Sequence, residues 1–249
     1  MGKVLVLLGA LAASVALVGT ALANHSWGSY HWARTSNPFM LKVGDNVNSK
    51  WDAYLDGAIA DWSPSSVLDL VKVAGGTRPK TCRATTGRIE ACNARYGSTG
   101  WLGIAQIWAS GSHITQAITK VNDTYFDTAT YNTPAWRRLV MCQEIAHDFG
   151  LAHQDENFNN ANLGSCMDYT SDPDGPPSNE HPNAHDFAQL ELVYGHLDSS
   201  STVASTPSSL PGNAPPFSQA SRANGDVYVD DLGHGVHRIT HVLWTPFGE

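Results

Sequence analysis

The chain has 249 residues, of which 42% are hydrophobic, and a formal net charge of −8. This length allows one domain with a substantial core plus an appendage, and the 8 tryptophans argue against global disorder. An acidic chain without basic clusters argues against nucleic acid and anionic membranes as partners.

Residues 1–23 have the features of a secretory signal peptide. Lys3 precedes an apolar run, and small residues follow that run up to Ala23, which is the order typical of a signal-peptidase site. The apolar run is short for a membrane span. We therefore expect cleavage after Ala23 and a secreted, extracytoplasmic protein with no membrane contact afterwards; a membrane anchor is the alternative.

The next part of the chain alternates between strand and helix patterns. Residues 27–47 predict an opening strand with a loop. Apolar residues from Trp51 to Trp62 then recur at helical spacing until Ser63-Pro64 ends the pattern. Further strands, separated by Gly, Ser, Pro and Asn, are predicted at residues 66–73, 87–97, 101–108 and 113–121.

Two helices are predicted after these strands. Thr133-Pro134 is a good N-cap and first-turn pair for a helix that ends near Gly150, and a last helix is predicted at residues 184–197. The rest is a Ser- and Pro-rich linker and a tail with strand-like alternation about a Gly-containing turn. The expected organisation is a signal peptide at 1–23, a folded domain at 24–198, the linker at 199–224 and a β-hairpin-like tail at 225–249.

All four cysteines lie in the part expected to be exported. An even count in an oxidising compartment indicates two disulfides, although four cysteines permit three connectivities. We expect Cys82–Cys92, which closes a short loop, and Cys142–Cys166, which ties the helix opened by Pro134 to a later segment. Free buried thiols are the alternative.

Residues 142–156 hold the pattern with the most chemical information. On a helix, Gln143 and His147 project from the same face because they are four residues apart. Gly150 then allows a sharp turn that returns His153 toward the same point. Glu144 lies where its carboxylate can reach a water at that point without being a ligand, so the segment has the parts that metal-assisted hydrolysis needs.

This segment resembles the metzincin zinc-peptidase signature H-E-x-x-H-x-x-G-x-x-H, with Gln143 in place of the first histidine. It matches at Glu144, His147, Gly150 and His153. Downstream, residues 164–170 resemble the methionine-containing turn of the same clan, with Met167 as the turn methionine and Tyr169 placed like the tyrosine of astacins and serralysins. The predicted last helix resembles the closing helix of matrixin-like domains.

The resemblance implies an α/β (α+β) fold with a twisted mixed β-sheet, a backing helix, an active-site helix and a small C-terminal subdomain that carries Met167 and the final helix. It also implies a monomeric zinc metalloendopeptidase that acts on protein or peptide substrates, with the sheet edge at residues 103–108 binding the substrate as an added strand. The implied mechanism has one zinc ion that activates a water, Glu144 as general base and Tyr169 as oxyanion donor. Its metal ligands are His147, His153 and, more weakly, Gln143.

Gln143 leaves two interpretations open. Its amide oxygen binds zinc less strongly than an imidazole, which gives an active centre of lower affinity. Alternatively, a glutamine satisfied by backbone groups marks an inactive, peptidase-like secreted binding module. A weaker hypothesis treats His147 and His153 as core histidines of another fold.

Other residues near the signature are candidate ligands. Asp155 is expected to support the site, either as a ligand or by orienting His153. Asp155, Asn157 and Asn159 resemble the start of a calcium loop, but the later glycine and glutamate are missing, which favours an Asn-rich turn. In the tail, His234, His237 and His241 form a possible metal cluster, although we expect solvated strand histidines.

Overall fold

The computed structural model describes residues 25–203 and 225–247. The expected signal peptide and nearly all of the expected linker lie outside the described residues, so both stay predictions. No helix in the described ranges has the length and apolar character needed to cross a bilayer.

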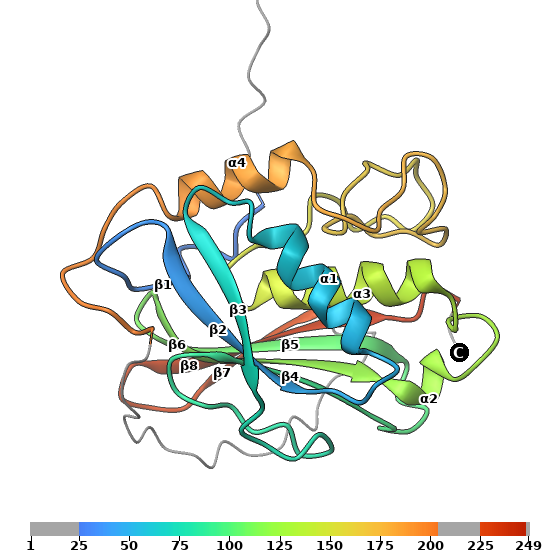
Figure 1. The fold of residues 1–249 in the computed structure, drawn as a ribbon, viewed down its shortest axis with the longest axis horizontal. Coiled ribbons are helices and arrows are strands. Elements are labelled where there is room, and N and C mark those ends of the chain that lie inside the picture. Colours follow the sequence, from blue (N-terminus) through green and yellow to red (C-terminus); the bar gives the residue numbers. More distant parts are fainter. Residues whose placement is uncertain (1–24, 204–224, 248–249) are drawn as a thin grey trace, which may run out of the picture.

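A single mixed β-sheet runs through the described chain (Figure 1). Its strands follow the order β3-β2-β4-β6-β5-β8-β7, and β1 pairs with β6. The pairs among β1, β2, β3, β4 and β6 are parallel, whereas β5, β7 and β8 pair antiparallel. The strands are β1 (His31–Trp32), β2 (Phe39–Asn46), β3 (Leu68–Ala74), β4 (Ile89–Ala94), β5 (Trp101–Ser110), β6 (His113–Asn122), β7 (Val227–Asp231) and β8 (Val236–Trp244).

The described helices are α1 (Asp52–Trp62), α2 (Asp123–Phe126), α3 (Pro134–His147) and α4 (Ala184–Val193). The longer helices α1, α3 and α4 lie on one side of this sheet, and the short α2 lies beside the ends of its strands (Figure 1). The Trp62 indole of α1 donates to the Cys142 carbonyl of α3 at 3.1 Å, which joins the two longer helices above the sheet. The predicted mixed sheet with a backing helix is therefore confirmed, and the predicted strands are all present.

Two helix ends differ from the prediction. The Thr133 side chain caps α3 as expected by accepting from the Trp136 N–H at 3.2 Å, but the regular helix ends at His147 rather than near Gly150. Similarly, α4 ends at Val193 and not at residue 197, because Tyr194 leaves the helical conformation and its hydroxyl donates to the Phe149 carbonyl at 2.9 Å. The short α2 was not predicted.

The structure contains both expected disulfides, Cys82–Cys92 and Cys142–Cys166. The first packs with Trp108 in a small cluster separate from the main core. The second connects α3 to the segment that carries Met167. The pairing therefore fastens the signature helix to the loop expected to lie beneath a metal.

The tail enters the main sheet. β7 and β8 form an antiparallel hairpin, and β8 pairs along β5 from Trp101 to Ser110. Because β6 occupies the other edge of β5, residues 103–108 have no free edge in this conformation. The edge at which the sequence analysis expects a substrate to bind is therefore occupied by β8 in the described conformation.

Candidate metal centre

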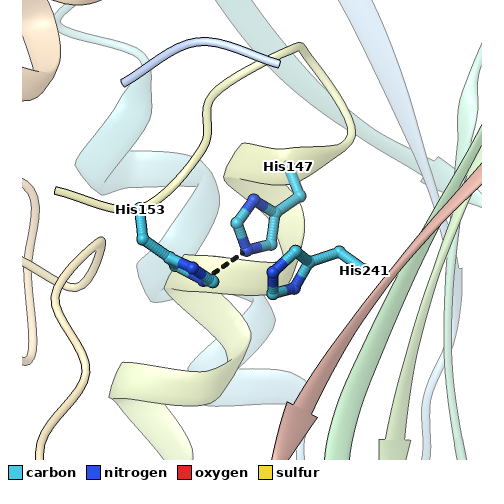
Figure 2. A group of neighbouring side chains, drawn as sticks. All are labelled: His147, His153 and His241. Carbon is cyan, nitrogen blue, oxygen red and sulfur yellow. Dashed lines mark hydrogen bonds between the residues drawn. The ribbon is translucent and has the colours of Figure 1, made fainter. Parts of the chain in front are cut away.

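Three imidazoles from distant parts of the sequence meet between α3 and the sheet (Figure 2). His147 is the last residue of α3, His153 lies in the loop that follows, and His241 comes from β8. One ring nitrogen of each lies within 4.8 Å of the corresponding atoms of the other two. Three neutral imidazoles in such a group are a common ligand set for zinc.

Gly150 brings His153 back to the helix end, as its place in the signature predicts. Its φ is +96°, a left-handed conformation that favours glycine. A Cβ at this position would lie 2.4 Å from the carbonyl oxygen of Tyr30. The turn between His147 and His153 therefore depends on glycine for both its backbone conformation and its packing.

Hydrogen bonds at the far side of two rings set where their lone pairs point. His147 Nδ1 lies 2.7 Å from the Leu151 carbonyl oxygen, and His153 Nδ1 lies 3.3 Å from a carboxylate oxygen of Glu156. Carbonyl and carboxylate oxygens accept, so each Nδ1 carries the proton and each Nε2 carries a lone pair. The two Nε2 atoms are 3.0 Å apart, and two facing lone pairs at this distance repel each other, which a cation bound by both would relieve.

His241 completes the group, contrary to the expectation that it is a solvated strand histidine. It is 1% exposed, and its ring centroid lies 4.1 Å from that of His147 and 4.3 Å from that of His153. Neither of its ring nitrogens has a hydrogen-bond partner among the described residues. The alternation of β8 gave a signal that sequence reasoning missed, because His241 lies between Ile239 and Leu243 on the face that packs into the core.

Burial keeps the three imidazoles neutral. It lowers the pKa of His147, His153 and His241 well below the ordinary value, and the proximity of the rings to one another lowers it further. Trp27 covers the group, with its ring centroid 5.4 Å from that of His147. Neutral imidazoles are the form that binds metals.

Gln143 lies one turn before His147 and is fully buried. Its amide nitrogen donates to the Cys166 carbonyl at 2.8 Å, while its amide oxygen has no hydrogen-bond partner among the described residues. An unpartnered buried amide oxygen is costly unless something else binds it. This oxygen is the atom that the sequence analysis expects to act as a ligand.

Glu144 is also fully buried, and both of its carboxylate oxygens lack hydrogen-bond partners in the described chain. Burial raises the pKa of Glu144 well above its ordinary value, and the Asp148 carboxyl raises it further. Glu144 packs against β5 at Gly103, where a Cβ would lie 2.4 Å from Oε1. Gly103, which sequence reasoning did not single out, therefore makes room for the expected base.

Met167 and Tyr169 both lie in the main core. The Tyr169 ring centroid is 4.2 Å from that of His153. Its hydroxyl donates to Asp226 Oδ2, at the start of the tail hairpin, at 2.9 Å. The expected oxyanion donor is thus bonded to the tail in this conformation.

The loop after His153 differs in detail from the expectation. The Asp155 carboxylate accepts from the Asn157 N–H at 2.7 Å and from the Asn160 amide at 3.0 Å, so it holds its own loop. Glu156 is the residue whose carboxylate contacts His153. The Asn159 N–H likewise binds the Asn157 side chain at 3.0 Å, which is the geometry of an Asn-rich turn.

Comparisons with known proteins add a distant likeness in fold. No protein-family model and no curated protein matches the chain. High choriolytic enzyme 1, a hatching-enzyme zinc protease from the medaka fish Oryzias latipes, is 13% identical, with 70% of this chain and 98% of that chain covered and a TM-score of 0.38. Myroilysin is 15% identical, with 70% and 99% covered and a TM-score of 0.40. Sequence identities and TM-scores this low carry no evidence about the function of this chain.

Proposed function

We propose that this chain is a secreted zinc-dependent endopeptidase whose C-terminal hairpin, residues 225–247, holds it closed. The observation that carries the proposal is the meeting of His147, His153 and His241, two of them with lone pairs directed at one point. A zinc ion held there supplies Lewis-acid chemistry for the activation of water.

The number of donors around the proposed ion is the reason for calling the described conformation closed, that is, without a free metal position for water or substrate. Zinc sites with four protein ligands are structural, whereas catalytic sites keep one position open. His147, His153 and His241, with the unpartnered oxygen of Gln143 as fourth donor, would fill all four positions. When the hairpin leaves, His241 leaves with it, and one position opens.

The hairpin also occupies the place of a substrate. β8 lies antiparallel along β5, with Ala105 opposite His241, so this edge accepts an extended segment. A protein or peptide substrate would bind there as an added strand in place of β8. The Tyr169 hydroxyl, released from Asp226, would then be free to donate to a developing oxyanion.

Glu144 is the expected base, and the closed state holds it inactive. Burial in this state raises the pKa of Glu144, which disfavours the ionised carboxylate that a general base needs. Once the hairpin leaves and water enters, the desolvation that raises the pKa is relieved. Glu144 would then take a proton from the attacking water and pass it to the leaving amine.

The experiment measures zinc content and casein hydrolysis for the wild-type protein, His241→Ala and the matched control His237→Ala, which changes the same strand outside the centre. We expect His241→Ala to retain zinc at micromolar free metal and to hydrolyse casein faster than the wild type, and His237→Ala to behave as the wild type. A chelator should abolish the activity. Adding Glu144→Gln to His241→Ala should lower the rate by a factor of about 100 to 10,000.

The other outcomes identify the alternatives. If His241→Ala loses its zinc, His241 is a permanent ligand and the hairpin is part of the working centre. If every form binds zinc and none hydrolyses casein, the chain is the non-catalytic binding module. If the wild-type protein binds no zinc at the imidazole group, the peptidase proposal fails.

A further inference from the structure

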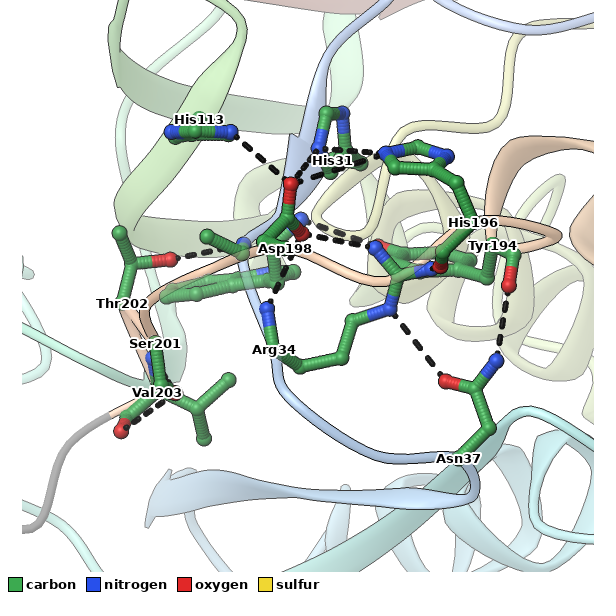
Figure 3. A network of polar contacts seen from close by, with 12 residues as sticks. His31, Arg34, Asn37, His113, Tyr194, His196, Asp198, Ser201, Thr202 and Val203 are labelled. Atoms are coloured by element: carbon green, nitrogen blue, oxygen red, sulfur yellow. Dashed lines mark hydrogen bonds and ion pairs between the residues drawn. The ribbon is translucent and has the colours of Figure 1, made fainter.

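A second group of histidines lies outside the centre described above (Figure 3). His31 is in β1, His113 begins β6, and His196 and Asp198 follow α4. His31 and His113 are register partners across the parallel β1–β6 pair. Three separated segments therefore bring three imidazoles and one carboxylate together.

Four distances among these groups lie near the edge length of a tetrahedral site, and the ligand atoms of His31, His113 and Asp198 all lie within 4.8 Å of one another. Zinc binds imidazole nitrogen and carboxylate oxygen at about 2.0–2.2 Å, so neighbouring ligand atoms of a tetrahedral site lie roughly 3.3–3.6 Å apart. Asp198 Oδ1 lies 3.5 Å from His31 Nε2, 3.3 Å from His113 Nε2 and 3.7 Å from His196 Nε2. His31 Nε2 and His196 Nε2 are 3.2 Å apart.

The surrounding contacts direct the donor atoms at the same point. His31 Nδ1 lies 2.7 Å from the Ser29 carbonyl oxygen, so Nδ1 carries the proton and the Nε2 lone pair faces the group. The other carboxylate oxygen of Asp198 accepts from the Arg34 N–H at 3.2 Å and from its guanidinium at 3.0 Å. Outer contacts of this kind fix the orientation of metal ligands.

We propose that His31, His113, His196 and Asp198 form a second zinc site. Four protein donors leave no open position, so the site is structural. It is independent of the proposed peptidase activity, because it shares no residue with the imidazole group of α3 and β8.

The position of the site indicates what the ion stabilises. Next to it, the Asp198 N–H donates to the Arg34 carbonyl at 2.9 Å, and the Thr202 N–H donates to the Ala33 carbonyl at 2.9 Å. The segment after α4 thus lies against the segment after β1. An ion held by His31, His113, His196 and Asp198 joins both segments to the start of β6.

The test uses His196→Ala and His113→Ala in the full-length protein. These side chains are 52% and 38% exposed, so their truncation leaves the core intact. The matched control is His181→Ala, which removes another exposed histidine that pairs with a carboxylate, Asp61, at 2.8 Å. Zinc per chain is measured after dialysis, and melting temperature is measured with and without added zinc.

We expect each test variant to lose about one zinc equivalent per chain, as follows from removal of one of four ligands, and to lose part of the zinc-dependent rise in melting temperature. His181→Ala should match the wild type. His147→Ala should retain this zinc, which separates the proposal from the fate of the peptidase centre. Unchanged zinc content in both test variants overturns the proposal, as does a fall in melting temperature that is the same with and without zinc.

Discussion

The ring of His241 stacks on the ring of His147, with the centroids 4.1 Å apart and the planes inclined by 30°. A strand of the tail thus supplies an imidazole to a helix whose own signature lacks one at Gln143. The imidazole group gains its third histidine from outside the motif. The missing histidine is therefore not by itself evidence of a lost metal site.

This relationship predicts the effect of restoring the motif. In the His241→Ala background, Gln143→His should tighten zinc binding, because it returns an imidazole to the face of α3 that carries His147. Outer contacts of a metal site alone contribute roughly 10-fold to 100-fold in metal affinity. We expect the added ligand to raise the zinc affinity by at least this factor. Competition with a chromophoric chelator measures it. Equal affinity of the single and double variants would show that position 143 does not face the ion.

Local patterns made most of the fold predictable. Thr133 and Pro134 give the start of α3 because capping is a property of neighbouring residues. The spacing of His147, Gly150 and His153 likewise predicts a turn that returns one ligand to another, and the positive φ of Gly150 agrees with it. Each of these signals lies within a few residues of the feature that it predicts.

The rest depended on pairing between distant segments. The burial of His241 follows from the register of β8 on β5, and nothing in the local sequence states which strand a hairpin joins. The same holds for Asp198, which meets His31 of β1 and His113 of β6 although the three residues are far apart in the sequence. The pattern indicated which face of β8 is apolar, whereas the sheet determined what that face covers.

The contact between Gly103 and Glu144 gives a second prediction. Gly103→Ala places a methyl group 2.4 Å from Glu144 Oε1, so the carboxyl must move within a packed interior. We expect a loss of about 1–3 kcal/mol in the free energy of unfolding and lower hydrolysis in the His241→Ala background. Urea denaturation and the casein assay measure the two effects.

The control for that substitution is Gly57→Ala in α1. No heavy atom lies within 4 Å of a Cβ at this position, and alanine is favoured over glycine inside a helix by about 0.5–1 kcal/mol. Gly57→Ala should therefore stabilise the protein and leave hydrolysis unchanged. Equal effects of the two substitutions would contradict the role given to Gly103.

The two disulfides should differ in their effect on zinc. Each is worth about 3 kcal/mol in the chain-entropy model for loops of these sizes, so Cys142→Ala/Cys166→Ala and Cys82→Ala/Cys92→Ala should destabilise the fold similarly. Only the first pair fastens α3 to the segment of Met167, so only its loss should weaken zinc binding at the imidazole centre. Zinc retention below the melting temperature distinguishes them, and equal retention would count against the proposed coupling.

Lys120 gives a prediction about pH. Burial and, to a smaller extent, the charge of Arg238 in the tail together lower the pKa of this amine from 10.5 to about 8. Between these two pH values the unfolded chain binds the proton and the folded chain releases it. The free energy of unfolding should therefore rise as pH increases from about 8 toward 10.5.

The variant Lys120→Met isolates this contribution. It removes a buried charge that costs about 3 kcal/mol below pH 8, from a shift of 10.5 to about 8 at about 1.4 kcal/mol per unit. For Lys120→Met we expect a higher free energy of unfolding at neutral pH and no rise of this free energy between pH 8 and 10.5. Lys72→Met is the control: the hydrogen bond that Lys72 donates to the Asp56 carboxylate raises the pKa of Lys72 above 10.5, so this amine stays protonated across the same window. Urea denaturation from pH 7 to 10 measures all three proteins, and a wild-type stability that falls through this window in parallel with Lys120→Met would contradict the assignment.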